Sequence, residues 1–342
     1  MPVRELHGPL KYFVVAMAVV GVVSTVGLAV DDRVLVGMPI WEKPLKFALS
    51  LGVYAATLAW MLSILDRGRR ISWWAGTVIA AASSVEVALI VVQVVRGKRS
   101  HFNDETAFDA ALYAVMGVTV AVLWLAGVVV AVLMFRQPLP DRATTWAIRF
   151  GSGIGVVGLA LGFLMSQPTP EQLSGHVVGT VGAHSVGVPD GGPHLPLTGW
   201  AATGGDLRIA HFTGMHALQV LPLLALALTA AAGRHPDTRL ADPAVRTRLV
   251  IVASAGYLGL VTLVTWQALR GQALVDPDPL TLTAASTLAL AWLTGTLLAL
   301  RLPPPHGKTP RSHTHPRDTE HVPAGPTTRP GERASHLHDR VS

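Results

Sequence analysis

Eight apolar blocks, each about twenty residues long, constrain this chain more than any other feature of its sequence. A helix of that length crosses the ~30 Å hydrocarbon core of a bilayer, and in lipid only helices and closed barrels satisfy the backbone polar groups. The blocks cover residues 10–30, 45–65, 73–95, 110–135, 147–166, 209–231, 249–269 and 280–302. The sequence therefore predicts an all-α, polytopic transmembrane helix bundle with eight spans.

The composition agrees with this class and excludes others. Half of the 342 residues are apolar and 14% are charged, whereas about a quarter are charged in soluble domains. The chain has no cysteine, which excludes disulfides, thiolate metal sites and a cysteine nucleophile. In a soluble protein the net charge of +6 would suggest a nucleic-acid partner. In a membrane protein, arginines beside anionic lipid explain it, so we expect the bilayer as partner and no nucleic acid.

Lysine and arginine counts predict the orientation of the chain. The first block is longer than the roughly 7–15 apolar residues of a signal peptide, so we expect it to be a retained span. With the N-terminus inside, the cytoplasmic segments hold 19 of the 27 basic residues and the outer loops hold eight. Without the C-terminal tail the contrast is 12 against eight, with the same sign. Cytoplasmic loops carry the excess of positive charge, which places both termini in the cytoplasm. We expect a multi-pass protein of a bacterial-type cytoplasmic (plasma) membrane.

Two segments differ from the eight-span domain, which covers residues 1–302. Residues 303–342 are rich in Pro, His and Arg without an apolar period, which predicts a disordered cytoplasmic tail. Residues 167–207 form the longest loop between spans, on the outer side, and a loop of this length is functional or disordered. Its aromatic and histidine residues favour an ordered cap, with the roles of the three histidines left open: His176, His184 and His194.

Basic residues in the first two outer loops oppose the orientation rule. They are Arg33, Lys43, Lys46, Arg96, Lys98 and Arg99. Either they hold an anionic group of a substrate or lipid, or neighbouring acids neutralise them as ordinary surface pairs. Both interpretations stay open.

Small residues recur on one face of the fifth block. Gly151, Gly155, Gly158 and Gly162 are spaced by three or four residues, which predicts close packing on a neighbouring helix. A nucleotide-binding loop would need a preceding strand, and the sequence predicts none there.

Glu86 is the one acid that these boundaries place inside a span. A charged side chain at the bilayer centre costs about 2.5–3.5 kcal/mol, so Glu86 needs a partner. Counted from the outer ends at ~1.5 Å per residue, Glu86 lies roughly 15 Å deep in the third span and His216 roughly 12 Å deep in the sixth. If these spans are neighbours, we expect Glu86 to meet His216 and Gln93 to meet His211.

A buried carboxylate beside imidazole predicts, as the first hypothesis, a membrane enzyme or redox protein that binds a transition metal ion or haem. Its site would open to the outer face and take a small or lipid-like substrate with an anionic group. The expected ligands of the metal or haem are Glu86, His101, His211 and His216. The expected catalytic residues are Glu86 and His216, with Asp206 and Arg208 as an anion clamp.

Two further hypotheses come from other classes of protein. In a proton-coupled transporter, Glu86 would load the proton and His216 would pass it on. In a structural or assembly protein, the same residues would form a hydrogen-bond network that holds helices together. Transport predicts polar residues along several spans, an enzyme predicts a closed pocket, and a structural role predicts silent Glu86→Gln and His216→Ala variants.

Overall fold

The computed structural model describes residues 5–137 and 139–303, which are helical apart from loops and four two-residue strands. Eight helices in this part of the chain are long and apolar enough to cross a membrane. They are α1 (Gly8–Val30), α2 (Glu42–Ser63), α3 (Arg69–Arg96), α4 (Ala107–Arg136), α5 (Arg142–Leu161), α7 (Leu207–Arg234), α8 (Pro243–Leu269) and α9 (Pro279–Arg301). The prediction of eight apolar helices of spanning length is confirmed.

Side-chain oxygens set where five of these helices begin, and the ring of His7 caps a sixth, α1. In each of the five, a side-chain oxygen accepts a hydrogen bond from a backbone N–H group of the first turn, which has no partner inside the helix. The capping residues of α4, α5, α7, α8 and α9 are Thr106, Asp141, Asp206, Asp242 and Asp278. The start of each of these spans is thus fixed by local chemistry.

Some helices extend beyond the apolar blocks and include acids at their ends. Asp109 lies in the first turn of α4 and is fully buried, and Glu42 lies in the first turn of α2. The expectation that Glu86 is the only acid inside a span is therefore wrong. Three side chains donate hydrogen bonds to the Asp109 carboxylate: Gln93, Arg96 and Thr106.

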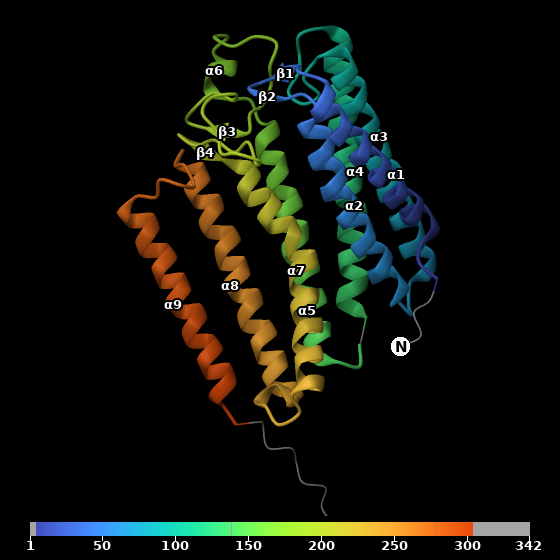
Figure 1. Cartoon of the computed structure of the whole chain (residues 1–342), viewed down its shortest axis with the longest axis vertical. Coiled ribbons are helices and arrows are strands. Elements are labelled where there is room, and N and C mark those ends of the chain that lie inside the picture. The colour runs from blue at the N-terminus through green and yellow to red at the C-terminus, as the bar shows by residue number, and fades with distance from the viewer. Residues whose placement is uncertain (1–4, 138, 304–342) are drawn as a thin grey trace, which may run out of the picture. The chain divides into compact units, whose positions relative to one another are not determined.

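The spans form two groups that lie side by side (Figure 1). In the first group α1 packs on α2 and α3 packs on α4, around a core that includes Phe13 and Ile79. In the second group α5 packs on α7, and both contact α8 around a core that includes Ile154 and Leu221. α9 packs on α8, and Thr281 and Ala299 are its buried residues. Most of α9 is therefore exposed, and we expect lipid to cover it.

The glycine face of α5 packs against α7, as predicted. A Cβ atom at Gly151 would lie 2.9 Å from the carbonyl oxygen of Ala217, and one at Gly158 would overlap the backbone of Gly214. Gly162 continues the same face, where an added Cβ atom would lie 3.1 Å from the ring of His211. These glycines allow the two helix backbones to approach more closely than any side chain would permit.

Ordered connections gather at one end of the bundle, which we call the cap end. Between α1 and α2, β1 (Val34–Leu35) pairs with β2 (Met38–Pro39). The predicted cap loop, residues 167–207, contains α6 (Pro170–Leu173) and the antiparallel pair of β3 (Ser185–Val186) with β4 (Gly205–Asp206). It follows the short helix η1 (Gly162–Ser166), which continues α5.

The opposite end of the bundle holds the start of α1 and the end of α9 (Figure 1). We call it the tail end. Both ends of the eight-span domain thus lie at the same end of the bundle, and their side of the membrane stays a prediction. The predicted disordered tail lies, beyond Pro303, outside the described residues.

Candidate functional site

Five of the six basic residues in the first two connections of the cap end are paired with acids. The pairs are Arg33 with Asp31, Lys46 with Glu42, Arg96 with Asp109, and both Lys98 and Arg99 with Glu105. For the Lys43 ammonium, no described carboxylate lies within the 4.0 Å of an ion pair, and the ring centroid of Phe47 is 6.0 Å away. Pairing with an acid therefore explains five of the six residues, although the partner of Arg96 is buried, and Lys43 is the exception.

Glu86 is 3% exposed, and its two carboxylate oxygens have different neighbours. The hydroxyl of Thr119 on α4 donates a hydrogen bond of 3.2 Å to Oε2. Nε2 of His101 lies 3.3 Å from Oε1, which accepts no hydrogen bond from any described residue. Lys43 is close enough to act electrostatically on this carboxylate. A carboxylate oxygen with a free acceptor position thus lies beside an imidazole and near an unpaired ammonium.

The predicted contacts between the third and sixth spans do not form. Nδ1 of His216 lies 3.3 Å from Oε1 of Gln219 on its own helix, and Gln93 donates a hydrogen bond to Asp109 instead. α3 packs against α1, α2 and α4, whereas α7 packs chiefly against α5 and α8. The predictions that Glu86 meets His216 and that Gln93 meets His211 are therefore wrong, because equal depth does not make two helices neighbours.

The cap loop supplies a histidine–aspartate pair that the sequence left without a role. Nδ1 of His184 lies 2.9 Å from Oδ2 of Asp190, whose carboxylate also accepts hydrogen bonds from the backbone N–H groups of His184 and Ser185. Because a carboxylate only accepts, Nδ1 carries the proton and Nε2 keeps a lone pair. No described residue forms a hydrogen bond with this Nε2. The pair thus presents one basic nitrogen in a fixed tautomer.

Several charges act on the protonation of this pair. Burial raises the pKa of Asp190, but hydrogen bonds from His184 and the backbone outweigh it and hold the pKa below its usual range. Burial lowers the pKa of His184 and of His101. The Arg208 guanidinium lowers the pKa of His184 further, and the ammonium of Lys43 lowers the pKa of both histidines. Asp190 partly opposes this shift in His184. Both imidazoles are therefore neutral at neutral pH, so that Nε2 of His184 can accept a proton.

Phe102 lies between the two histidines. Its ring centroid is 4.8 Å from that of His184 and 6.1 Å from that of His101. Its backbone has a φ of +60°, a conformation that costs a non-glycine residue about 1–3 kcal/mol unless the surroundings hold it. The cap loop does so, since the backbone N–H of Val181 donates a hydrogen bond of 3.1 Å to the Phe102 carbonyl. Phe102 thus connects the α3–α4 connection to the cap loop at the site.

Asp206 and Arg208 are brought together, and most of their polar atoms hold the cap loop in place. The ion pair measures 2.6 Å, and Asp206 also accepts a hydrogen bond from the backbone N–H of Ala201. The Arg208 guanidinium uses Nε and Nη2 on Asp206 and on the carbonyl of Gly199. Nη1 of Arg208 makes no hydrogen bond with the described residues. It is therefore the nitrogen of this pair that could bind an anion, as the predicted anion clamp requires.

The four predicted metal or haem ligands are not all brought together. Glu86 and His101 are adjacent, but His216 lies beside Gln219, and Nδ1 of His211 lies 2.8 Å from the carbonyl oxygen of Gly158. Within residues 5–137 and 139–303, no group of three or more His, Asp or Glu side chains is arranged to hold a metal ion. The side chains that do gather are acid–base groups and one lysine.

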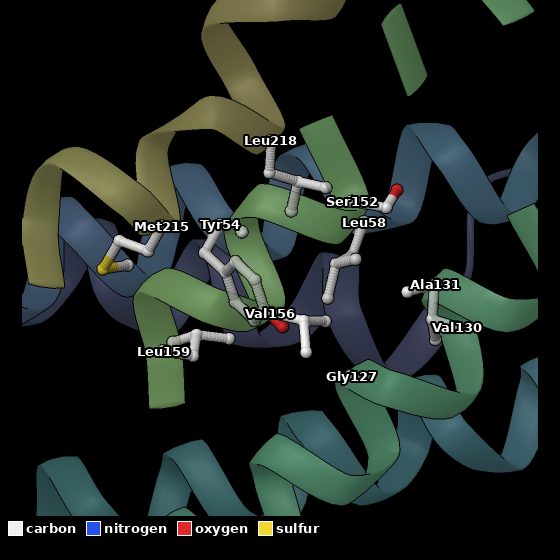
Figure 2. A pocket seen from close by; sticks show the side chains of 11 residues that line it. Tyr54, Leu58, Gly127, Val130, Ala131, Ser152, Val156, Leu159, Met215 and Leu218 are labelled. Atoms are coloured by element: carbon white, nitrogen blue, oxygen red, sulfur yellow. The ribbon is translucent and has the colours of Figure 1, made fainter. Parts of the chain in front are cut away.

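A small pocket lies elsewhere in the bundle, between α2, α4, α5 and α7 (Figure 2). Its volume is about 20 Å³, room for about one water molecule, and its wall is mostly apolar. The hydroxyl of Tyr54 lies near Gly127 in this wall, together with side chains such as Val156 and Leu218. None of the acid–base residues of the cap end lines the pocket, so it is separate from the candidate site.

Comparisons with known proteins give no assignment. No family model matches the chain, and no match is found among curated proteins or solved structures. The function is therefore argued from the geometry of the site.

Proposed function

We propose that the protein is an integral membrane enzyme that carries out acid–base chemistry at its cap end. Its substrate is a small or lipid-like molecule with an anionic group, and the cap end lies on the extracytoplasmic face. The observation that carries the proposal is the His184–Asp190 pair, with its free Nε2, close to the unpaired Lys43.

Each residue has a role that follows from its chemistry. His184 is the general base, because Asp190 fixes its tautomer and stabilises the imidazolium that forms when Nε2 takes a proton. Lys43 binds the anionic group of the substrate, since a half-buried ammonium without a carboxylate partner gains most from an anion. Glu86 and His101 form the second proton-transferring pair, through the oxygen of Glu86 that accepts no hydrogen bond.

The test uses the full chain in lipid nanodiscs. The protein is incubated with a bacterial lipid extract and with a panel of small carboxylates and phosphate esters, and mass spectrometry detects products. We expect His184→Gln to lower kcat by about 10²–10⁴-fold, the usual contribution of a general base. We expect Lys43→Gln to raise KM. His176→Gln and Lys98→Gln are the matched controls, since His176 is exposed in the same loop and Lys98 is paired with Glu105.

Two outcomes would contradict the proposal that the protein is an enzyme. One is the absence of product with every substrate class, and the other is an unchanged rate in His184→Gln. If Glu86→Gln and His184→Gln also had no phenotype in cells, a structural or assembly role would replace the proposed enzyme.

Metal or haem dependence stays a prediction from the sequence and is not needed for the roles above. Elemental analysis and an absorption spectrum of detergent-purified protein test it. A stoichiometric metal or a Soret band that is lost in His101→Ala or His216→Ala would support it.

A proton-coupled transporter is the second candidate, and buried polar groups favour it. Besides Oε1 of Glu86, the hydroxyls of Ser83 and Ser152 and the amide nitrogen of Gln219 are buried without a hydrogen-bond partner among the described residues. In a transporter, such groups would be hydrated when water enters the pathway. In proteoliposomes with an internal pH dye, transport predicts substrate-dependent proton uptake that Glu86→Gln abolishes, and an enzyme predicts none.

A further inference from the structure

A group of arginines lies at the tail end of α7, α8 and α9, away from the candidate site. Its members are Arg234 at the end of α7, Arg239 in the short helix η2 (Arg239–Ala241), Arg246 and Arg248 in α8, and Arg301 at the end of α9. In the part of the chain that the structure describes, none of the five forms an ion pair with a carboxylate. The tail end therefore carries a local excess of positive charge.

Part of this group has a structural task. Nη1 of Arg239 donates hydrogen bonds of 2.9 and 3.0 Å to the carbonyls of Leu300 and Arg301, and Arg248 donates to those of Leu302 and Pro303. The carbonyls of Leu300 and Arg301 are the last of α9, and those of Leu302 and Pro303 follow directly after it, so none of the four has a partner inside the helix. The task leaves Nε and Nη2 of Arg239 and the whole guanidinium of Arg301 without a hydrogen bond to the described residues.

The free donors border a pocket of about 240 Å³. Its walls are Arg239, Asp242, Val245, Arg301, Leu302 and Pro303. Asp242 is its one acid, and that carboxylate accepts a hydrogen bond of 2.8 Å from the backbone N–H of Ala244, where the helix dipole of α8 offsets its charge. Two exposed arginines with free donors thus face a space large enough for a phosphate group.

The surroundings of the pocket match a lipid rather than a soluble ligand. α9 packs on α8, and its large apolar side chains are exposed over its whole length, from Leu280 through Leu290 and Trp292 to Leu298. Exposed Leu302 continues this surface to the wall of the pocket. In a bilayer, acyl chains cover this surface, and the pocket lies at the end of the helices, at the level of the headgroups.

We infer that this pocket binds the phosphate of an anionic phospholipid whose acyl chains lie along α8 and α9. A guanidinium matches phosphate oxygens with two parallel hydrogen bonds, and Arg239 and Arg301 each keep a free pair of donors. Juxtamembrane arginines also attract anionic headgroups electrostatically. This site is independent of the acid–base site at the cap end.

Native mass spectrometry of the full chain, released from detergent with added lipid, tests the inference. Phosphatidylglycerol, phosphatidylcholine and inorganic phosphate are compared on the wild type, Arg301→Gln and Arg239→Gln/Arg301→Gln. The side chain of Arg301 makes no hydrogen bond with the described residues, so the single variant keeps the cap of α9 intact. Arg67→Gln/Arg70→Gln is the matched control, with two exposed arginines at the same end outside the pocket.

We expect phosphatidylglycerol to be retained in preference to phosphatidylcholine, with its affinity lowered about fivefold for each pocket arginine removed and unchanged in the control. Equal retention of the two lipids, or wild-type retention by the double variant, would overturn the inference. Displacement of phosphatidylglycerol by inorganic phosphate would overturn the inference that the ligand is a lipid, and would assign the pocket to free phosphate.

Discussion

At the scale of single residues, Lys43 carries the strongest constraint on function. Its side chain is half-buried beside three ionisable groups, Glu86, His101 and His184, yet none of them pairs with it directly. An ammonium held in such a place has lost part of its hydration without a counter-ion. A bound anion would compensate for the lost hydration. A role in binding such an anion explains why Lys43 has no acidic partner while the five neighbouring basic residues do.

The protonation of His184 predicts the pH dependence of the reaction. Burial, Arg208 and Lys43 together hold the pKa of His184 below its ordinary value of 6.5, so the neutral base is lost only as the pH falls through that lower pKa. We expect the acid limb of kcat/KM to lie below pH 6.5. In Asp190→Asn the hydrogen bond that raises the pKa of His184 is weakened, so the limb should move to still lower pH while the rate falls.

A pH profile from pH 4 to 9 of the wild type and Asp190→Asn measures both effects, with Asp104→Asn, at an exposed acid elsewhere in the cap end, as control. An acid limb above pH 6.5, or a shift to higher pH in Asp190→Asn, would exclude His184 as the base.

Part of this site could be predicted from the sequence. Glu86 and His101 were both expected in it, because an acid in an apolar block and a histidine at the end of the same block are visible directly. The pairing of His184 with Asp190 was missed, since it depends on the turn that brings two loop residues six positions apart together. The one signal was the run Pro189-Asp190-Gly191-Gly192, which indicates a turn but not what it brings together.

At the scale of helices, periodicity predicts faces but not neighbours. The three- and four-residue spacing of the glycines on α5 gave a packing face, and α7 occupies it. The polar residues of α3 and α7 also lie at comparable depths, but α3 belongs to the first group of helices and α7 to the second (Figure 1). Which helices touch depends on the whole set of contacts, which no single span encodes.

The contact of α5 with α7 makes a prediction about stability. In Gly158→Ala the new methyl group would overlap the backbone of Gly214 and Met215, so the two helices must move apart. Overpacking of this kind costs about 1–3 kcal/mol, and we expect at least that loss here because backbone rather than a flexible side chain is in the way.

Thermal unfolding in detergent measures the loss. Gly117→Ala is the matched control, since no atom lies within 4 Å of its added Cβ and alanine favours a helix. An unfolding temperature of Gly158→Ala equal to that of Gly117→Ala would mean that α5 and α7 are not packed backbone to backbone.

At the scale of the whole molecule, the two ends of the bundle differ in chemistry. The cap end gathers acids, histidines and Lys43, whereas the tail end holds arginines without carboxylate partners among the described residues. The number of apolar helices could be predicted because the apolar blocks are local properties of the sequence. The full set of residues at the cap end could not be predicted, because three connections that are distant in the sequence converge there.

The orientation of these ends is directly testable, because the chain has no cysteine and a single introduced one is an unambiguous reporter. Val178 is 88% exposed in the cap loop, and Ala241 is exposed at the tail end. In intact cells we expect a membrane-impermeant maleimide to label Val178→Cys, and to label Ala241→Cys only after lysis. The reverse pattern would place the candidate site on the cytoplasmic side.

The central claim is that Lys43 from α2, His101 from the α3–α4 connection and the His184–Asp190 pair of the cap loop form one site. NMR of histidine-labelled protein in nanodiscs, with His184 assigned by its loss in His184→Gln, tests it most directly. We predict that His184 titrates below 6.5 and that its pKa rises in Lys43→Gln but not in Lys98→Gln. A pKa of His184 that is the same in Lys43→Gln as in the wild type would contradict the account.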